Sequence, residues 1–144
     1  MINFLDQEDI LLIHHNQIEL YGGQAGIRDQ ALLESAISQP QITFGEEFLH
    51  KDIYEMAAAY LFHLVQDHPF IDGNKRTGIM TAMIFLDFHQ IELNCTNDEL
   101  EEMVLNLAAG KVSKSEAALF FEKHSLSKWV WIGPIFRLGK LCEP

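Results

Sequence analysis

The chain has 144 residues, a net charge of −11 and 48% hydrophobic residues, enough to build the core of one domain and too many for a wholly disordered chain. No apolar run is long enough to cross a membrane, and so acidic a chain is a poor general binder of nucleic acid, whose phosphates are held by basic surfaces. Two isolated cysteines and an N-terminus without a signal-peptide pattern are what we expect of a cytoplasmic protein.

The first part of the chain is predicted to be helical, with one glycine-rich interruption. Asp6 is a candidate N-cap for a helix over residues 6–16. The sequence Tyr-Gly-Gly-Gln-Ala-Gly at 21–26 must form a loop. Its GGxxG pattern can cradle phosphate in principle, but it lacks the flanking strand and the lysine of a P-loop. A short helix is predicted over 29–38, followed by a short strand or hairpin at 41–44.

Two longer helices are predicted on either side of a break in the middle of the chain. Apolar residues recur every three or four positions from 51 to 66, which predicts an amphipathic helix. The stretch from 74 to 90 is apolar around nearly its whole circumference, which predicts a buried central helix. The break between them contains a proline and a glycine and therefore forms a tight turn.

Two further helices are predicted from capping boxes at residues 96–99 and 113–116. They end at Gly110 and near His124. Residues 125–144 hold both tryptophans and show no clear period. Within this tail, the segment Trp-Val-Trp-Ile could dock on the domain, form a dimer contact or bind a partner protein, and the sequence leaves these alternatives open.

The break at residues 68–76 carries the candidate chemistry and reads His-Pro-Phe-Ile-Asp-Gly-Asn-Lys-Arg. The first N–H groups of the helix that begins near Asn74 have no intrahelical partner and lie at the positive end of its dipole, so they form an anion site. Asn74 adds an amide, Lys75 a point charge and Arg76 a planar fork that suits phosphate oxygens. A buried helix behind the site holds it rigidly, as electrostatic catalysis requires.

Two further side chains of this break complete a site for transfer to or from a phosphate. His68 lies just before the turn and can take a proton from a hydroxyl near neutral pH. Asp72 offers an oxygen ligand to Mg²⁺, which usually takes one or two carboxylates plus substrate phosphates. Each residue also has a purely structural interpretation, with Asp72 as a helix cap, His68 as a helix-end histidine, and Lys75 and Arg76 as solvated charges.

Residues 68–76 resemble the signature of the Fic/Doc family, His-Pro-Phe-x-Asp/Glu-Gly-Asn-Gly/Lys-Arg, and match its eight specified positions. Residues 21–36 resemble the N-terminal part of death-on-curing (Doc) toxins, and the helix over 57–65 before the motif is also similar. The resemblance covers about residues 1–124. We therefore expect a Fic/Doc domain over 1–124 and a tail over 125–144 that lies outside it.

The resemblance implies a small all-α helical bundle in which the motif joins two central helices. It implies that His68 is the general base that deprotonates a serine, threonine or tyrosine of a target protein, and that Asp72 holds Mg²⁺. Phe70 points into the core and fixes the loop. Four consecutive residues are implied to bind the phosphates of the nucleotide, namely Gly73, Asn74, Lys75 and Arg76.

Two departures from most Fic proteins decide which reaction we expect. Most Fic proteins transfer AMP, with glycine at the position of Lys75 and a second arginine at that of Ile79. The Asn-Lys-Arg form is that of Doc toxins, which resemble Fic proteins but work as protein kinases: they bind the nucleotide reversed and transfer its γ-phosphate. We expect this reaction with ATP and Mg²⁺ on a translation elongation factor such as elongation factor Tu, so that translation and growth stop.

Two alternatives stay open beside phosphate transfer. One is AMP transfer to a protein hydroxyl. The other is a Fic-fold binding module without chemistry, against which the intact His68, Asp72 and Arg76 count. Many Fic proteins also carry a Ser/Thr-x-x-x-Glu-Gly/Asn helix that blocks the nucleotide site, and we find no such motif on either side of the active segment. The expected control is therefore a separate antitoxin of the Phd type.

The remaining histidines suggest no metal site. His63 and His68 are five residues apart and do not share a helix face, and His14 and His15 are adjacent and point apart. We read the three other histidines as surface or helix-end residues, namely His50, His89 and His124.

Overall fold

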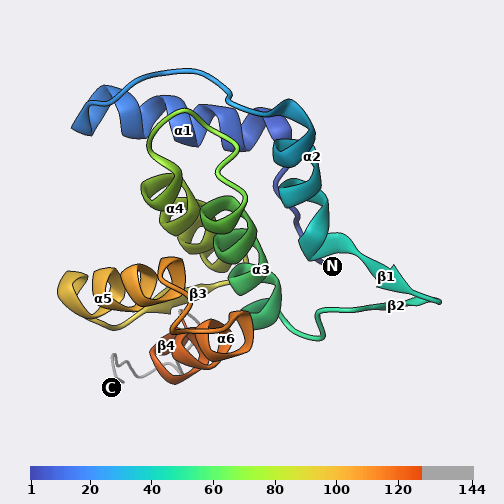
Figure 1. Ribbon diagram of the computed structural model, residues 1–144. Coiled ribbons are helices and arrows are strands. Elements are labelled where there is room, and N and C mark those ends of the chain that lie inside the picture. The colour runs from blue at the N-terminus through green and yellow to red at the C-terminus, as the bar shows by residue number, and fades with distance from the viewer. Residues whose placement is uncertain (128–144) are drawn as a thin grey trace, which may run out of the picture.

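The computed structural model describes residues 1–127 as a helical bundle with a few short strands (Figure 1). The α-helices are α1 (Gln7–Tyr21), α2 (Gln30–Ser38), α3 (Ile53–Gln66), α4 (Asn74–Phe88), α5 (Asn97–Ala108) and α6 (Lys114–Lys123), and a 3₁₀ turn, η1 (Gln39–Gln41), follows α2. The strands are β1 (Thr43–Phe44), β2 (Glu47–Phe48), β3 (Ile91–Leu93) and β4 (Ser125–Ser127). Predictions for residues 128–144, including the tryptophan segment at 129–132, fall outside the described residues.

The predicted all-α class is confirmed, and the first helix is longer than predicted. Asp6 caps α1 in a capping box with Asp9, but the helix runs to Tyr21 instead of residue 16. The polar residues after 16 do not break a helical backbone, and Gln17 is buried on its inner face. The helix ends only where Gly22 and Gly23 adopt positive φ values of 84° and 116°. Within residues 1–127, no helix is both long enough and apolar enough to cross a membrane.

The helices α3 and α4 pack against each other in the middle of the bundle, with α1 and α2 on one side and α5 and α6 on the other (Figure 1). Gly78 lets them approach closely, because a Cβ atom there would lie 3.2 Å from Val65 Cγ2 and 3.4 Å from Leu61 O. The central position predicted for α4 is confirmed. Its burial is not complete, because Met83 and Phe88 are exposed.

Two antiparallel strand pairs extend the bundle. β1 and β2 form the short hairpin predicted near residues 41–44, which projects from the domain (Figure 1). β3 pairs with β4, with Ile91 opposite Ser127 and Leu93 opposite Ser125. Residues 125–127, which the sequence assigned to the tail, therefore continue the folded part of the chain by one strand.

Tyr60 ties the N-terminal segment to the central helix, and this contact is testable. Its buried hydroxyl accepts a hydrogen bond from Leu5 N (2.9 Å) and donates one to Leu5 O (3.2 Å), and burial raises its pKa to about 12. We expect Tyr60→Phe to lower the free energy of unfolding by about 1–3 kcal/mol in urea, because Leu5 is left with unpaired buried groups. Tyr54→Phe loses one half-buried bond to Ser125 and is the control; equal losses in both variants would contradict the assignment.

Candidate active site

The loop that joins α3 to α4 carries the motif. Asp67 caps the C-terminus of α3, and His68 follows with a positive φ of 50°. Phe70 is completely buried, and Gly73 caps the N-terminus of α4 in the left-handed conformation with φ 80°. Left-handed backbone is common for glycine but uncommon for histidine, so the loop holds His68 in a strained conformation.

The side chain of Asn74 holds this loop in shape. Its Oδ1 accepts a hydrogen bond from Phe70 N (2.9 Å), and its Nδ2 donates to Phe70 O (3.0 Å) and to His68 Nδ1 (3.1 Å). Both amide hydrogens are therefore used inside the loop, and the residue is only 5% exposed. The sequence suggested this amide as part of the anion site; in the structure Asn74 can meet an anion only through its backbone N–H.

The contact with Asn74 also determines the tautomer of His68. The bonds to Phe70 fix which amide atom is the nitrogen, and a side-chain NH₂ group can only donate. His68 Nδ1 is thus the acceptor, and a neutral ring carries its proton on Nε2. The basic lone pair of His68 lies beside Asn74 in this arrangement.

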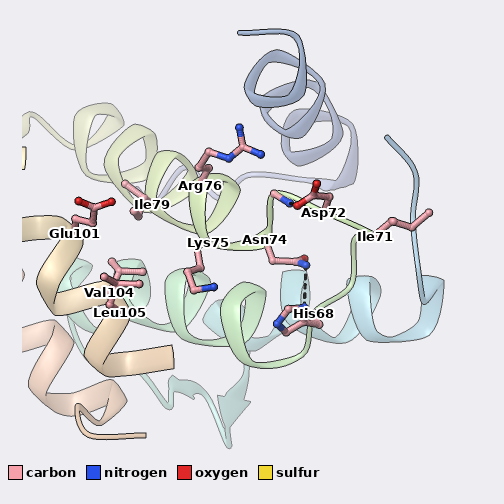
Figure 2. A pocket seen from close by; sticks show the side chains of 11 residues that line it. His68, Ile71, Asp72, Asn74, Lys75, Arg76, Ile79, Glu101, Val104 and Leu105 are labelled. Atoms are coloured by element: carbon pink, nitrogen blue, oxygen red, sulfur yellow. Dashed lines mark hydrogen bonds between the residues drawn. The ribbon is translucent and has the colours of Figure 1, made fainter. Parts of the chain in front are cut away.

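The N-terminus of α4 opens into a pocket of about 320 Å³ that contains the predicted site residues (Figure 2). The first backbone hydrogen bond of the helix runs from Thr77 N to Gly73 O. The N–H groups of the three preceding residues therefore have no partner within the helix. The motif residues that line the pocket are His68, Asp72, Gly73, Asn74, Lys75 and Arg76. The structure therefore brings together every residue that the sequence analysis assigned to catalysis, metal or phosphate.

The two cations of the motif leave α4 in different directions. Lys75 is exposed and points to the side of His68, whereas Arg76 extends toward α1 (Figure 2). Arg76 donates to Gly22 O (3.0 Å) and to Gln17 O (3.3 Å). Since a guanidinium has five N–H donors, these two bonds leave three for an anion.

Asp72 is held as an ionised carboxylate at the rim of the pocket. It accepts backbone hydrogen bonds from Gln24 N (3.2 Å) and Gly73 N (2.8 Å), and these two bonds, with the nearby Arg76 and His14, lower its pKa below its usual value. The carboxylate is exposed and keeps free lone pairs, so it fits as a ligand of Mg²⁺. Across residues 1–127 no three acidic, histidine or cysteine side chains surround a metal-sized space, so phosphate oxygens and water would complete the coordination.

The glycine-rich loop belongs to this site, although it does not form the phosphate cradle considered from its GGxxG pattern. Residues 22–29, here called the strap, run along the active loop. Ile71 N donates to Gly26 O (3.0 Å), and Arg28 N donates to Pro69 O (2.7 Å). Gly23 must lack a side chain, because a Cβ atom there would lie 2.8 Å from Asp72 Oδ2. The strap thus orients Asp72 and the backbone of the active loop.

Two further parts of the site, His14 and a wall from α5, belong to no motif that sequence analysis could detect. His14 is buried, stacks on Phe70 with ring centroids 3.8 Å apart, and donates from Nε2 to Asp72 O at 2.8 Å. From α5, one wall of the pocket is formed by Glu101, Val104 and Leu105, which face Ile79 of α4 (Figure 2). These residues lie far from the motif in sequence, so only the folded chain shows that they belong to the site.

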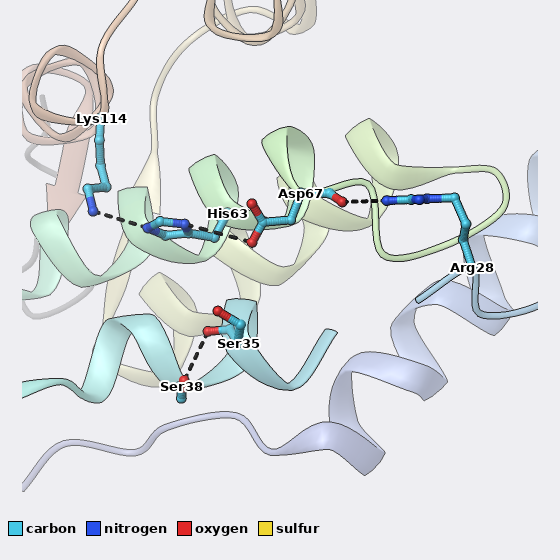
Figure 3. Close-up of polar contacts among 6 residues, drawn as sticks. All are labelled: Arg28, Ser35, Ser38, His63, Asp67 and Lys114. Carbon is cyan, nitrogen blue, oxygen red and sulfur yellow. Dashed lines mark hydrogen bonds and ion pairs between the residues drawn. The ribbon is translucent and has the colours of Figure 1, made fainter. Parts of the chain in front are cut away.

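A partly buried polar cluster lies behind the loop (Figure 3). His63 Nε2 accepts from Lys114 Nζ (3.1 Å), and His63 Nδ1 lies 4.0 Å from Asp67 Oδ2. Burial lowers the pKa of His63 to about 4, with a further contribution from Lys114. His50, expected at the surface or a helix end, is instead buried at 6% exposure beside this cluster, and the expectation for it was wrong.

The other two histidines that we expected at the surface or at helix ends, His89 and His124, do lie at helix ends. His89 caps α4 and His124 caps α6, and each donates from Nδ1 to a carbonyl of the preceding turn.

Comparison with known proteins assigns the chain to a family. The model of the Fic/DOC family matches residues 4–86, which is more than half of the chain. The chain is 30% identical over 114 residues to the protein kinase doc of Escherichia phage P1, a match that covers 79% of this chain and 89% of the relative. It is 34% identical over 93 residues to the toxin Doc of Mycolicibacterium smegmatis, covering 65% and 69% respectively. The chain therefore belongs to the Fic/DOC family.

The role of Asn74 can be tested by stability. Asn74→Ala removes three hydrogen bonds and leaves the buried N–H and C=O of Phe70 without their partner. We expect the free energy of unfolding in urea to fall by about 1–3 kcal/mol. Asn97→Ala, at an exposed position on α5, is the control and should change it by less than about 0.5 kcal/mol. A loss at Asn74 no larger than that at Asn97 would show that the amide does not hold the loop.

The cluster at His63 predicts a dependence of stability on pH. Folded His63 binds its proton only near pH 4, whereas the unfolded residue binds it near pH 6.5. The unfolded state binds more protons between these values, so stability falls as the pH falls through this window. His63→Gln should reduce the loss of unfolding free energy between pH 7 and pH 5 by up to about 2 kcal/mol, measured by urea denaturation. His50 and Asp67 titrate in both proteins, so an unchanged pH dependence would contradict the role of His63.

Proposed function

We propose that this chain is a Doc-type toxin that transfers the γ-phosphate of ATP to a serine or threonine hydroxyl of a translation elongation factor, such as elongation factor Tu, and so arrests translation and growth. The observation that carries the proposal is the pocket at the N-terminus of α4, which combines His68, Asp72, Lys75 and Arg76 with unpaired helix N–H groups. The names of the two relatives, a protein kinase and a toxin, support both parts of it.

The choice of phosphate transfer over AMP transfer rests on two pocket residues. Lys75 fills the space that a glycine would leave at the helix start and adds a positive charge to it. Ile79 contributes an apolar side chain to the wall, at the position where AMP-transferring relatives have a second arginine. A site with one arginine and one lysine at the helix N-terminus suits a single phosphoryl group presented to His68.

Binding follows from the electrostatics of the helix start. The N–H groups of Asn74, Lys75 and Arg76 meet phosphate oxygens at the positive end of the α4 dipole. The Lys75 ammonium and the free N–H groups of Arg76 add charge-assisted bonds. Asp72 would hold Mg²⁺, which supplies charge neutralisation on the phosphates when bound.

Transfer moves one phosphoryl group and one proton. The target hydroxyl oxygen bonds to the γ-phosphorus, the bond from phosphorus to the bridging oxygen breaks, and ADP leaves with that oxygen and its electron pair. The hydroxyl proton passes to His68. In the neutral ring the basic lone pair of His68 is on Nδ1, where it accepts the bond from Asn74, so the proton replaces this bond and is later released to water.

Control by a separate antitoxin of the Phd type is part of the proposal. The name of the M. smegmatis relative, a toxin, supports a partner that restrains the chain. The sequence offers no inhibitory Ser/Thr-x-x-x-Glu-Gly/Asn helix on either side of the active segment, so restraint would come from another chain.

Intact-mass analysis tests the reaction. We expect elongation factor Tu incubated with this protein, ATP and Mg²⁺ to gain one phosphate, and His68→Ala to reduce the rate by about 10²–10⁴, the usual contribution of a general base. His15→Ala, at an exposed histidine on α1, is the matched control and should retain the wild-type rate.

Other outcomes decide between the alternatives. A gain of one AMP would keep the transferase and overturn phosphate transfer. Labelling of a different protein in a cell lysate would keep the reaction and overturn the target. Absence of transfer in both experiments, with folded protein, would favour a binding module.

A further inference from the structure

Arg28 binds three consecutive carbonyl groups of the active loop. Its Nη2 donates to Asp67 O (2.9 Å), its Nε to His68 O (2.6 Å) and its backbone N to Pro69 O (2.7 Å). Figure 3 shows the guanidinium reaching from the strap to the end of α3. One residue of the strap therefore determines where the main chain runs on both sides of His68.

These carbonyls lie where a helix end needs partners. The last C=O groups of a helix have no intrahelical donor and lie at the negative end of its dipole, so a planar cation is well matched to them. Water can satisfy exposed carbonyls as well, but water cannot fix the direction of the chain. The two parallel bonds from one rigid guanidinium fix the direction of the chain, because they require the carbonyls of Asp67 and His68 to point the same way.

The conformation that this clamp holds is an unfavourable one. His68 has a φ of 50°, a left-handed value that is uncommon for residues with a side chain, although histidine adopts it more often than most. Asn74 contacts the ring from one side, and Arg28 binds the carbonyl of the same residue from the other. Without Arg28, His68 is free to relax to a right-handed or extended backbone, which swings its ring away from the pocket.

We propose that Arg28 is a positioning residue for His68: its side chain holds the left-handed backbone that keeps the imidazole at the mouth of the pocket. Arg28 does not line the pocket itself, so it acts through His68 and not on the nucleotide. The inference rests on the proposed function insofar as it concerns the rate of transfer. Its structural part, the placement of the His68 ring, is testable without any reaction.

The side chain can be removed without dismantling the strap. The backbone bonds from Arg28 N and Asp29 N to Pro69 O, and from Ile71 N to Gly26 O, do not involve it. Arg28→Ala therefore removes only the bonds to Asp67 and His68. Arg28→Lys keeps the charge but lacks the planar fork that reaches both carbonyls.

The first experiment measures ring placement by NMR. The ¹H–¹³C cross-peak of the His68 ring, assigned by its loss in His68→Gln, should shift or broaden in Arg28→Ala and Arg28→Lys, while that of His89 at the far end of α4 stays in place. Gln30→Ala is the matched control, because Gln30 lies two residues away and its side chain donates to Gln7 and Glu34, away from the active loop. An unmoved His68 cross-peak in folded Arg28→Ala would overturn the inference.

The second experiment measures transfer. We expect Arg28→Ala to lower kcat by about 10², the usual cost of a misplaced catalytic group, with the KM for ATP unchanged and partial recovery on adding guanidinium ion. In a His68→Ala background, Arg28→Ala should cause no further loss. Full activity in Arg28→Ala, or a further loss in the double variant, would overturn the positioning role of Arg28.

The two experiments together separate this inference from the proposed function. If the wild-type chain transfers nothing while the His68 cross-peak moves as expected in the Arg28 variants, the proposed function is overturned and the positioning role stands.

Discussion

Phe70 is buried against His14, and both polar groups of its main chain are bound by the side-chain amide of Asn74. This pair of contacts turns the chain between α3 and α4 into a rigid loop instead of a flexible linker. The loop in turn places His68, Asp72 and the start of α4 around one pocket. Breaking the two bonds to Phe70 would leave the buried amide of Asn74 without partners, which costs free energy, so the folded chain keeps this arrangement.

The active loop forms no helix or strand beyond an isolated β-bridge between Phe70 and Ile27, and it depends on a second segment of the chain. The strap supplies hydrogen bonds to Asp72, Pro69 and Ile71, and its glycines allow the close approach that these bonds need. Two positive charges near the loop are held in place without being neutralised, because Arg28 and Arg76 both donate to main-chain carbonyls. In a chain with a net charge of −11, this arrangement keeps a small cationic site that an anion can enter.

Behind the loop, the His63 cluster couples the end of α3 to α6. Lys114 is held next to His63, and burial lowers the pKa of both. Asp67 lies between this cluster and Arg28, and Arg28 binds its carbonyl. The end of α3, from which the active loop starts, is therefore bonded to α6 through His63 and to the strap through Arg28, although neither α6 nor the strap contains a motif residue.

The sequence by itself determined the helices, their caps and the motif. Periodicity located α3, the capping boxes located α5 and α6, and the resemblance of residues 68–76 located the pocket. These features are local: each depends on residues within a few turns of one another. For the same reason, the sequence misplaced the end of α1, where no local pattern marks a stop before the glycines.

Only the tertiary structure decided what each site residue is bonded to. It directed the amide of Asn74 into the loop, made Phe70 stack on His14, buried His50, and brought the strap to the active loop and α5 to the pocket. Apart from the Asn74 bonds to Phe70, which lies four residues away, these contacts join residues that are tens of positions apart, so their strength depends on burial and on the direction of hydrogen bonds after folding. Neither composition nor spacing contains that information. The partners of a side chain depend on how the helices pack against one another, and the sequence pattern does not specify the orientation of that packing.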